Sequence, residues 1–428
     1  RTSALREKFL AESLRCLDQR VERMGGALAL FNCPPLQALE RVAADHEIEA
    51  IHYTLLAGTE EAEEAAEVER WTGDRRVALK CYEGVSMVPA GELPFRIDKV
   101  PGTFTTFRKR VEHNCQIPKP LQAPERIQFA DNNRYDGRPS VPDVQPDPRR
   151  ALSFEGGETA GLARLKHYFW QEDHLARYKS TRNGMIGEDY SSKLSPWLAH
   201  GCLSPRLVWH QIKKYEEKRT SNQGTYWLGF ELLWRDFFYF TALKEKARLF
   251  KRGGIQQVDL PWSLNKQRFK AWQQGRTGYP IVDANMVELK ETGFMSNRGR
   301  QIVASFLTKT MGIDWRLGAE WFEQHLVDYD PASNWGNLQY QSGVGNDARS
   351  YRLFNPDIQA DKYDKKAEYV KHWLAELKHL APDQAHRPWE QSQVEYPQPV
   401  VDYKQAYRER RDAIKAHLAK EPTPTGAK

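Results

Sequence analysis

Hydrophobic positions in the first hundred residues alternate between helical spacing and short apolar runs. Helical spacing joins Phe9, Leu10, Leu14, Leu17, Val21 and Met24, and it stops at Gly25 and Gly26, since glycine commonly ends a helix. The elements that follow are an apolar run at 27–31, a helix at 36–45, a strand at 48–56, a Glu-rich helix at 59–70 and a strand at 77–82. Because strands and helices alternate, the sequence predicts an α/β domain with a parallel sheet and right-handed crossovers.

Hydrophobic periodicity disappears between residues 113 and 155 and then becomes helical almost throughout. The segment 113–155 is rich in Pro, Asp, Asn and Arg, which predicts a long inter-domain linker on the surface. Beyond it, apolar residues recur every three or four positions, as in Leu228, Leu232, Leu233 and Phe237. The predicted organisation is an α/β domain at 1–112, a linker at 113–155, an all-α domain at 156–420 and a disordered tail at 421–428.

Composition excludes several classes of protein. The 428 residues are 40% hydrophobic and 28% charged, and no run approaches about 18 consecutive apolar residues, so we expect a soluble, intracellular protein that does not enter a membrane. Five cysteines without a C-x-x-C pair argue against disulfides and against structural zinc. The net charge is +6, and because residues 59–70 contribute −5, the remaining chain carries +11. Such a surface suits a polyanion, and solubility alone is the alternative explanation.

Tryptophan is unusually frequent, with 13 residues, of which only Trp71 precedes residue 160. This density is typical of a large helical core. It also suits stacking platforms for bases or a path for electrons, and composition leaves the three interpretations open.

The segment from Tyr190 to Trp197 places three serines and Lys193 directly before a helix that we expect to start at Pro196. Ser195 has the residue type and the position of an N-cap. Hydroxyls and a lysine at a helix start suit a phosphate or pyrophosphate, and an ordinary cap is the alternative.

The string from Gly343 to Ala348 has the form G-x-G-x-x-A. It follows no strand pattern and opens no apolar helix, which argues against a dinucleotide-binding fingerprint. We expect a glycine loop at the floor of a pocket.

Three polar groups interrupt the apolar helices. They are Asp328, Asp330 and Asn334; Asn297, Arg298 and Arg300; and Glu231, Trp234 and Arg235. A buried carboxylate needs a cationic partner, which an arginine of the second group could supply to an aspartate of the first. A ligand site and a purely structural Asp–Arg clamp both remain open.

At these residues the chain resembles the photolyase and cryptochrome family, and its DASH branch in particular. The matching segments are 231–237, 278–284, 296–300, 313–316, 328–340 and 343–347. The resemblance runs from about residue 1 to residue 415 and is dense from 178 to 356. It implies a Rossmann-like parallel-sheet domain followed by a large all-α domain that binds FAD.

The resemblance also implies which residues bind the cofactor, and it implies no metal. The residues matched to the pyrophosphate and ribityl region are Tyr178, Ser191, Ser192, Lys193, Leu194 and Ser195. Those matched to the pocket wall are Glu231, Trp234, Arg235, Phe238 and Asn297. Asp328 and Asp330 would face polar atoms of the flavin, and Arg300 would clamp Asp328. Asn334 would lie at flavin N5, where a neutral amide accommodates a reduced flavin.

The implied reaction is light-driven repair, in which excited reduced flavin passes an electron to a flipped cyclobutane pyrimidine dimer, the ring splits, and the electron returns. The residues matched to catalysis are Glu231, Asn297, Asn334, Trp315 and Trp262, and those matched to DNA contacts are Trp234, Arg298, Gln301 and Tyr340. Flipping costs least in a single strand, so we expect a monomer that binds single-stranded DNA, with RNA or looped duplex as alternatives. Asn297 stands where (6-4) photolyases carry histidine, which argues against that activity.

The chain departs from the family at three places. The family's first strand and its W-F-R-x-D-L-R segment are absent, so we expect the first strands of the α/β domain to be missing. This absence weakens the match of Glu83 to an antenna site for 5,10-methenyltetrahydrofolate. Leu338 stands at the inner position of the family's tryptophan chain, and Trp335 is either its substitute or a packed aromatic residue.

Three hypotheses for function follow. The first is a deoxyribodipyrimidine photo-lyase-like enzyme that is active mainly on single-stranded DNA. The second is a blue-light photoreceptor that binds FAD and nucleic acid without significant repair. The third is a helical nucleic-acid-binding protein without a cofactor.

Overall fold

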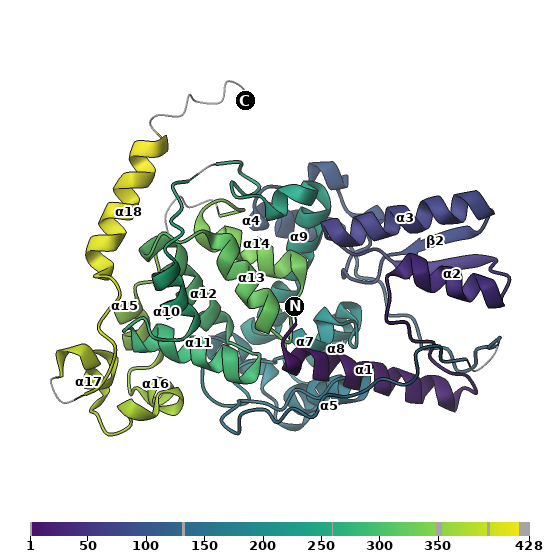
Figure 1. Ribbon diagram of the computed structural model, residues 1–428. Coiled ribbons are helices and arrows are strands. Elements are labelled where there is room, and N and C mark those ends of the chain that lie inside the picture. Colours follow the sequence, from purple (N-terminus) through teal and green to yellow (C-terminus); the bar gives the residue numbers. More distant parts are fainter. Residues whose placement is uncertain (1, 131–132, 259, 348–352, 392–393, 419–428) are drawn as a thin grey trace.

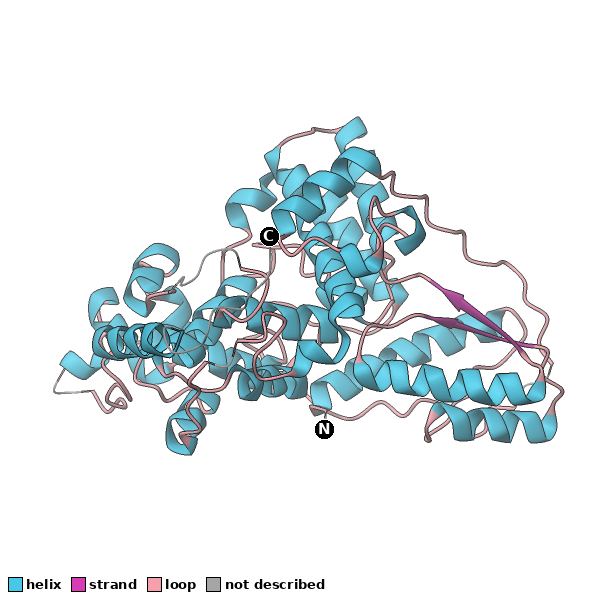
Figure 2. Cartoon of the chain, turned by 90° about the horizontal axis from the view of Figure 1, so that it is seen from above, coloured by secondary structure: helices cyan, strands magenta, loops and turns pink. Residues whose placement is uncertain are grey.

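The structure is a computed structural model that describes residues 2–130, 133–258, 260–347, 353–391 and 394–418. The predicted tail at 421–428 lies outside these residues. Figures 1 and 2 show a small two-stranded sheet at one end of the molecule and helices throughout the remainder. Among the described residues, no helix is long and apolar enough to cross a membrane.

A two-stranded parallel sheet forms the centre of the N-terminal part. The elements are α1 (Ala4–Arg23), α2 (Pro35–Asp45), β1 (Ala50–Thr54), α3 (Thr59–Arg75) and β2 (Ala78–Tyr82). The strands pair in parallel from Ala50 with Ala78 to Thr54 with Tyr82, and α3 connects them. Consecutive parallel strands need such a crossover, because a tight turn would join them in an antiparallel arrangement. The predicted parallel α/β arrangement is confirmed.

The apolar run at 27–31 does not form a strand of this sheet, so its place in the predicted alternation was wrong. Leu30 instead pairs with Tyr135 in an isolated parallel bridge, in which Leu30 N donates to Arg134 O at 3.2 Å and Asp136 N donates to Leu30 O at 3.0 Å. The partner lies more than a hundred residues away, in the segment between the two parts of the chain. Local periodicity cannot report such a partner.

The C-terminal part is helical. After α4 (Phe104–Asn114), the described residues form no helix or strand until α5. The helices are α5 (Glu158–Lys166), α6 (Tyr178–Thr181), α7 (Ser195–Ala199), α8 (Pro205–Lys218), α9 (Gln223–Glu245), α10 (Lys266–Gln273), α11 (Pro280–Thr292), α12 (Asn297–Ser305), α13 (Trp315–His325), α14 (Pro331–Ser342), α15 (Pro356–Tyr363), α16 (Glu368–Trp373), α17 (Pro382–His386) and α18 (Tyr403–Leu418). The predicted all-α architecture is confirmed.

Helix α9 is the central helix of this part. It begins at a capping box in which the Asn222 side chain accepts from the backbone of Gly224 and Thr225. Its second half is buried almost all round, which is typical of a helix inside a core rather than on a surface. Where α9 meets α14, Gly336 faces Phe238, and a Cβ at Gly336 would lie 2.4 Å from the ring. Glycine therefore lets the two helices pack closely.

Candidate cofactor and substrate site

One face of α9 presents the first group of predicted site residues. Glu231, Trp234 and Phe238 follow at spacings of three and four, so their side chains emerge on the same side of the helix. Glu231 is half-buried and forms an ion pair with Arg182, which follows α6. The Glu231 and Arg182 side chains both lie at the edge of the site, where each is partly exposed to solvent.

The indole of Trp234 lies between aromatic rings from two other helices. Phe104 of α4 stacks on it, with ring centroids 3.8 Å apart and planes inclined by 12°. Tyr340 of α14 stands perpendicular to it, at 5.7 Å and 88°. Phe104 thus covers one face of the Trp234 ring. The rings of Trp234 and Tyr340 form a right-angled corner.

Arg235 and Asp236 join α9 to the loop after β2. Arg235 donates from Nη1 to Val85 O and from Nη2 to Leu198 O at 3.1 Å. Asp236 accepts from Met87 N at 2.9 Å and from Val88 N at 3.3 Å. Burial raises the pKa of the Asp236 carboxyl to about 7. Sequence reasoning missed Asp236, although a lone carboxylate among aromatic residues was a signal that it has buried partners.

The loop before α7 holds the predicted phosphate-binding residues. Ser192, Lys193 and Leu194 are buried, Ser191 is half-buried and Ser195 is exposed. The prediction that Ser195 is an N-cap was wrong: it is the first residue of α7, its hydroxyl makes no cap bond, and it donates instead to Asp328 Oδ2 at 2.6 Å. That acceptor lies in a loop 133 positions later in the chain. Rules for helix caps consider only residues next to the helix start, so they do not predict it.

The Lys193 ammonium points into the protein. It donates to Glu188 O at 2.6 Å and to Gly187 O at 3.1 Å, and it lies 3.3 Å from the centre of the Tyr190 ring. Desolvation lowers its pKa to about 7. The side chain therefore holds the loop together.

Arg164 of α5 organises the same loop from its other side, and sequence reasoning missed it. Its buried guanidinium donates to Ser192 O at 3.0 Å and to Ser191 O at 3.2 Å, and Nη1 lies 2.8 Å from Asp189 Oδ1. Nη1 also donates to Glu188 Oε1 at 2.9 Å, and these contacts of one planar cation fix the loop conformation.

Among the described residues, one group could hold a metal ion, namely His167, Glu188 and Asp189. Arg164 already contacts both carboxylates of this group. The cation that these oxygens require is therefore supplied by the protein.

Arg300 and Asp328 form the predicted ion pair. Arg300 Nη2 lies 2.9 Å from Asp328 Oδ1 and 2.8 Å from Oδ2, and the carboxylate side chain is 2% exposed. With the Ser195 hydroxyl as a second partner, a nearly buried charge is satisfied from α12 and α7 at once. The expected clamp is confirmed as a contact.

Asp330 and Asn334 lie at the start of α14. Asp330 Oδ1 accepts from Ser333 N at 2.7 Å, so Asp330 is the N-cap of this helix. Asn334 is 7% exposed, and its Nδ2 donates to Ala319 O at 3.0 Å. This hydrogen bond to α13 fixes the orientation of the amide.

Helix α12 carries the remaining predicted contacts with substrate. Asn297 is exposed at its first turn, and Gln301 is half-buried one turn later. Arg298 is buried, donates to Asn183 Oδ1 at 2.9 Å and lies 4.5 Å from the Tyr363 ring. The structure thus brings Asn297 to the surface and holds Arg298 beneath it.

Tyr178 lies at the first position of α6 and is 7% exposed. Burial raises the pKa of its phenol to about 12, while the nearby Arg182 acts in the opposite direction. The protonated phenol can donate a hydrogen bond to a ligand.

The tryptophans matched to an electron path lie on two adjoining segments. Trp262 directly precedes Ser263, which pairs with Ile313, two residues before Trp315. The Trp315 ring is fully buried and meets Trp335 edge-on, at 5.6 Å and 84°. Leu338 is 3% exposed and packs near Gly318 of α13.

A cavity of about 310 Å³ lies between the α9 C-terminus, the segment before α4 and the loop after α14. Gly345 and Asn346 line it, so the predicted glycine loop does lie at the wall of a pocket. None of the residues matched to FAD lines this cavity. Glu83, matched to an antenna contact, accepts from Ala90 N and shapes the loop after β2.

Comparison with known proteins assigns the chain to a family. Residues 1–125 match the family described as DNA photolyase, and residues 227–416 match the FAD binding domain of DNA photolyase. The chain therefore belongs to the photolyase and cryptochrome family.

Several relatives within the family are named cryptochrome DASH. The protein of that name from Gloeobacter violaceus is 46% identical over 94% of this chain and 84% of its own length. The protein of that name from Synechocystis sp. is 45% identical over 96% and 87%. The Synechocystis cryptochrome crystal structure has a TM-score of 0.91 at 44% identity, covering 96% of this chain and 89% of that one. A class III photolyase from Agrobacterium tumefaciens has a TM-score of 0.85 at 29% identity, covering 98% and 89%.

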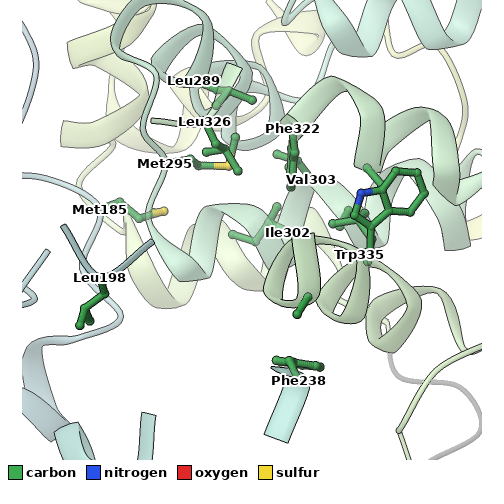
Figure 3. Close-up of a cluster of buried hydrophobic side chains, with 14 of the residues drawn as sticks. Met185, Leu198, Phe238, Leu289, Met295, Ile302, Val303, Phe322, Leu326 and Trp335 are labelled. Atoms are coloured by element: carbon green, nitrogen blue, oxygen red, sulfur yellow. The ribbon is translucent and has the colours of Figure 1, made fainter. Parts of the chain in front are cut away.

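The residues present fit FAD in their chemistry. The Ser195 hydroxyl, the Arg300 guanidinium and the Asn334 amide supply donors and acceptors of the kind that a pyrophosphate, a ribityl chain and a flavin edge require. Figure 3 shows the apolar side chains nearby, among them Leu198 of α7, Phe238 of α9 and Ile302 of α12. Polar and apolar walls from several helices are what an amphiphilic cofactor requires.

Proposed function

We propose that the protein is a light-driven enzyme that splits cyclobutane pyrimidine dimers, mainly in single-stranded DNA. The observation that carries this proposal is the corner formed by Trp234 and Tyr340, whose rings meet at 88°. Two adjoining apolar faces suit a lesion in which two pyrimidines are joined and can no longer stack as separate bases. Glu231, one turn before Trp234, places a hydrogen-bond acceptor at the same opening.

FAD, when bound, supplies the absorption of blue light and a one-electron donor. The proposed cofactor contacts are the side chains of Tyr178, Ser191, Ser192, Ser195, Trp234, Arg235, Phe238, Arg300, Asp328, Asp330 and Asn334. Lys193 and Leu194 contribute through their backbone, because the Lys193 ammonium is bonded to the loop itself. Asn334 is held by Ala319 O, so its amide presents a neutral group with a fixed orientation.

The substrate contacts lie on α9, α12 and α14. Glu231 and Asn297 are proposed to hydrogen-bond the flipped pyrimidines, and Gln301 stands one turn behind Asn297. Arg298 acts from beneath, because its guanidinium orients Asn183 and packs on Tyr363. Single strands are favoured, since a base that has no partner costs less to flip.

A photoreceptor that binds FAD and nucleic acid without repair is the second candidate, and buried Leu338 argues against a receptor that signals through photoreduction. Leucine cannot carry an electron, so a role that depends on fast photoreduction would need another route. A repair role needs only that FAD be supplied reduced.

The test is a repair assay on a single-stranded oligonucleotide that carries one thymine dimer. Protein reduced with dithionite is mixed with substrate, and dimer loss is followed by chromatography under blue light and in darkness. We expect light-dependent loss with turnover, faster on the single strand than on the duplex. Binding of the oligonucleotide without light-dependent loss would exclude the enzyme and leave the photoreceptor.

A further inference from the structure

A row of aromatic rings leads from the Trp234 corner to the outer end of α9. Phe104, which stacks on Trp234, meets Phe230 edge-on at 5.0 Å and 83°. Phe230 stacks on Trp227, at 4.8 Å and 25°. Tyr226 ends the row, at 6.3 Å from Trp227, and it is 37% exposed.

Two cations lie over the faces of these rings. Lys179 Nζ lies 4.5 Å from the Trp227 ring, and the Arg108 guanidinium lies 5.6 Å from the Phe230 ring. We call Arg108, Lys179, Tyr226, Trp227 and Phe230 the outer aromatic surface. It adjoins the substrate site, because Arg182, the partner of Glu231, also lies 5.9 Å from the Trp227 ring.

The charge of this surface is positive and only partly neutralised. Arg108 lies 3.4 Å from Glu112, and Arg182 pairs with Glu231. Lys179 is exposed, donates to Gln223 Oε1 at 2.9 Å and forms no ion pair within the described ranges. One positive charge therefore stands beside the exposed Tyr226 and the half-buried Trp227 without a carboxylate to balance it.

This combination matches one class of partner. A single exposed tyrosine needs no explanation. A row of rings with cations across their faces is complementary to a single strand, because rings stack on bases and cations bind phosphates. A protein partner would require a larger apolar patch, since the aromatic faces exposed here belong to only a few residues. The row also starts at the residues that we assign to the lesion, so a strand bound there is continuous with it.

We propose that the outer aromatic surface binds the nucleotides that flank the flipped dimer in a single strand. A base lies against Tyr226 and Trp227, and a phosphate lies at Lys179. This inference rests on the proposed function, because it takes the bound strand as the substrate. It adds a binding surface for undamaged nucleotides that contributes to affinity and leaves the chemistry at the dimer unchanged.

The test compares two matched double variants. Lys179→Gln with Tyr226→Ala removes one charge and one exposed ring from the surface. Lys80→Gln with Tyr82→Ala removes the same groups from β2, where both side chains are exposed. Affinity for an undamaged 5′-labelled 16-nucleotide oligothymidylate is measured by fluorescence anisotropy over a salt series. Repair of a dithymidine dimer dinucleotide, which has no flanking nucleotides, is measured in parallel.

We expect the surface variant to bind the oligothymidylate about tenfold or more weakly than the parent. The slope of log K against log salt should become shallower by about 0.7, the value for one phosphate contact on a single strand. The β2 variant should match the parent in both, and all three proteins should repair the dinucleotide equally. Tyr226→Phe, which retains the ring, should bind almost as well as the parent.

Three results would overturn the inference. They are equal oligothymidylate affinity in the two double variants, parallel loss of dinucleotide repair in the surface variant, and a parent protein that does not bind the oligothymidylate at all. A parent that binds the oligothymidylate but repairs nothing would refute the proposed repair activity. The comparison of the double variants would still show whether the outer aromatic surface binds the strand. Unchanged FAD absorbance in each variant verifies that the fold is retained.

Discussion

Arg300 Nη2 lies within hydrogen-bonding distance of both oxygens of Asp328, at 2.9 and 2.8 Å, and this pair links α12 to the turn before α14. Within the part of the chain that the structure describes, the carboxylate has a single further hydrogen-bond partner, the Ser195 hydroxyl. Because the Asp328 side chain is 2% exposed, its charge depends on these two groups.

We expect Arg300→Leu to lower the free energy of unfolding by about 3 to 5 kcal/mol, because it leaves a buried carboxylate without its cation. We also expect the variant to lose FAD on gel filtration. The control is Arg316→Leu, which breaks a pair of similar geometry with Asp314, 2.8 Å long and also at a helix start. Chemical denaturation and the ratio of flavin to protein absorbance measure both effects. If Arg300→Leu retained its flavin in full, the Arg300–Asp328 pair would have only a structural role and no role in cofactor binding.

Glu231→Ala and Asn297→Ala should each slow dimer repair while FAD stays bound. Each loses a hydrogen bond to a buried polar ligand, which costs about 1 to 3 kcal/mol, or roughly 5-fold to 150-fold in kcat/KM. Repair kinetics on a dimer-containing single strand measure the effect, with Asn114→Ala as an exposed amide control. Flavin loss without a separate change in repair would show that these residues serve the cofactor.

The sequence was sufficient for many of the elements and for the contact between Arg300 and Asp328. Helical spacing located α9, and alternation of elements predicted the parallel pairing of β1 with β2. These features depend on local patterns, because burial of one face imposes a period on neighbouring residues. The family motifs then fixed which polar residues belong together.

What the sequence could not supply were partners far away in the chain. Asp236 binds the backbone of Met87 and Val88, about 150 positions earlier, and Arg164 binds the loop at 188–192. Lys193 differs for another reason. It looked free to bind phosphate, but its loop is buried and folds so that the ammonium donates to the loop's own carbonyls at Gly187 and Glu188. Tertiary packing determines these contacts, because a buried cation must be hydrogen-bonded and the acceptors available to it are those that the fold places nearby.

A pH dependence of stability should follow from Glu288. This buried carboxyl accepts from the Tyr369 hydroxyl at 2.6 Å, and burial raises its pKa to about 7, against 4.5 as the ordinary value. Between these values the native protein keeps a proton that the unfolded chain has released. The stabilisation is therefore complete below about pH 4.5 and is lost as the pH rises to 7, with a slope of up to about 1.4 kcal/mol per pH unit.

Glu288→Gln should make that slope shallower, because the amide does not titrate. Urea denaturation from pH 4.5 to 6 measures it, a range that ends about one pH unit below the pKa of Lys193, which desolvation lowers to about 7. Glu291→Gln, on the same helix and half-buried, should keep the slope of the parent. Identical slopes in Glu288→Gln and the parent would mean that Glu288 is ionised throughout this range.

The last prediction concerns photoreduction of bound FAD. Trp315 is buried and meets Trp335 edge-on at 5.6 Å, whereas Leu338, at the inner position of the family's tryptophan chain, has no accessible redox state. The Trp335 indole N–H lies 3.2 Å from Glu323 Oε2, which holds the ring against α13. We therefore expect the Trp335 ring to serve as packing and not to complete the path inward.

Illumination with an external electron donor should accordingly reduce FAD slowly in the parent protein. Leu338→Trp should accelerate this reduction, because it restores an aromatic carrier between Trp315 and the cofactor, while Trp335→Phe should leave the rate unchanged. Bleaching of the oxidised flavin absorbance under continuous blue light measures all three rates. Fast photoreduction in the parent that disappears in Trp335→Phe would show that electrons pass through Trp335 instead. Fast photoreduction that survives both Trp335→Phe and Trp315→Phe would show that neither tryptophan carries them.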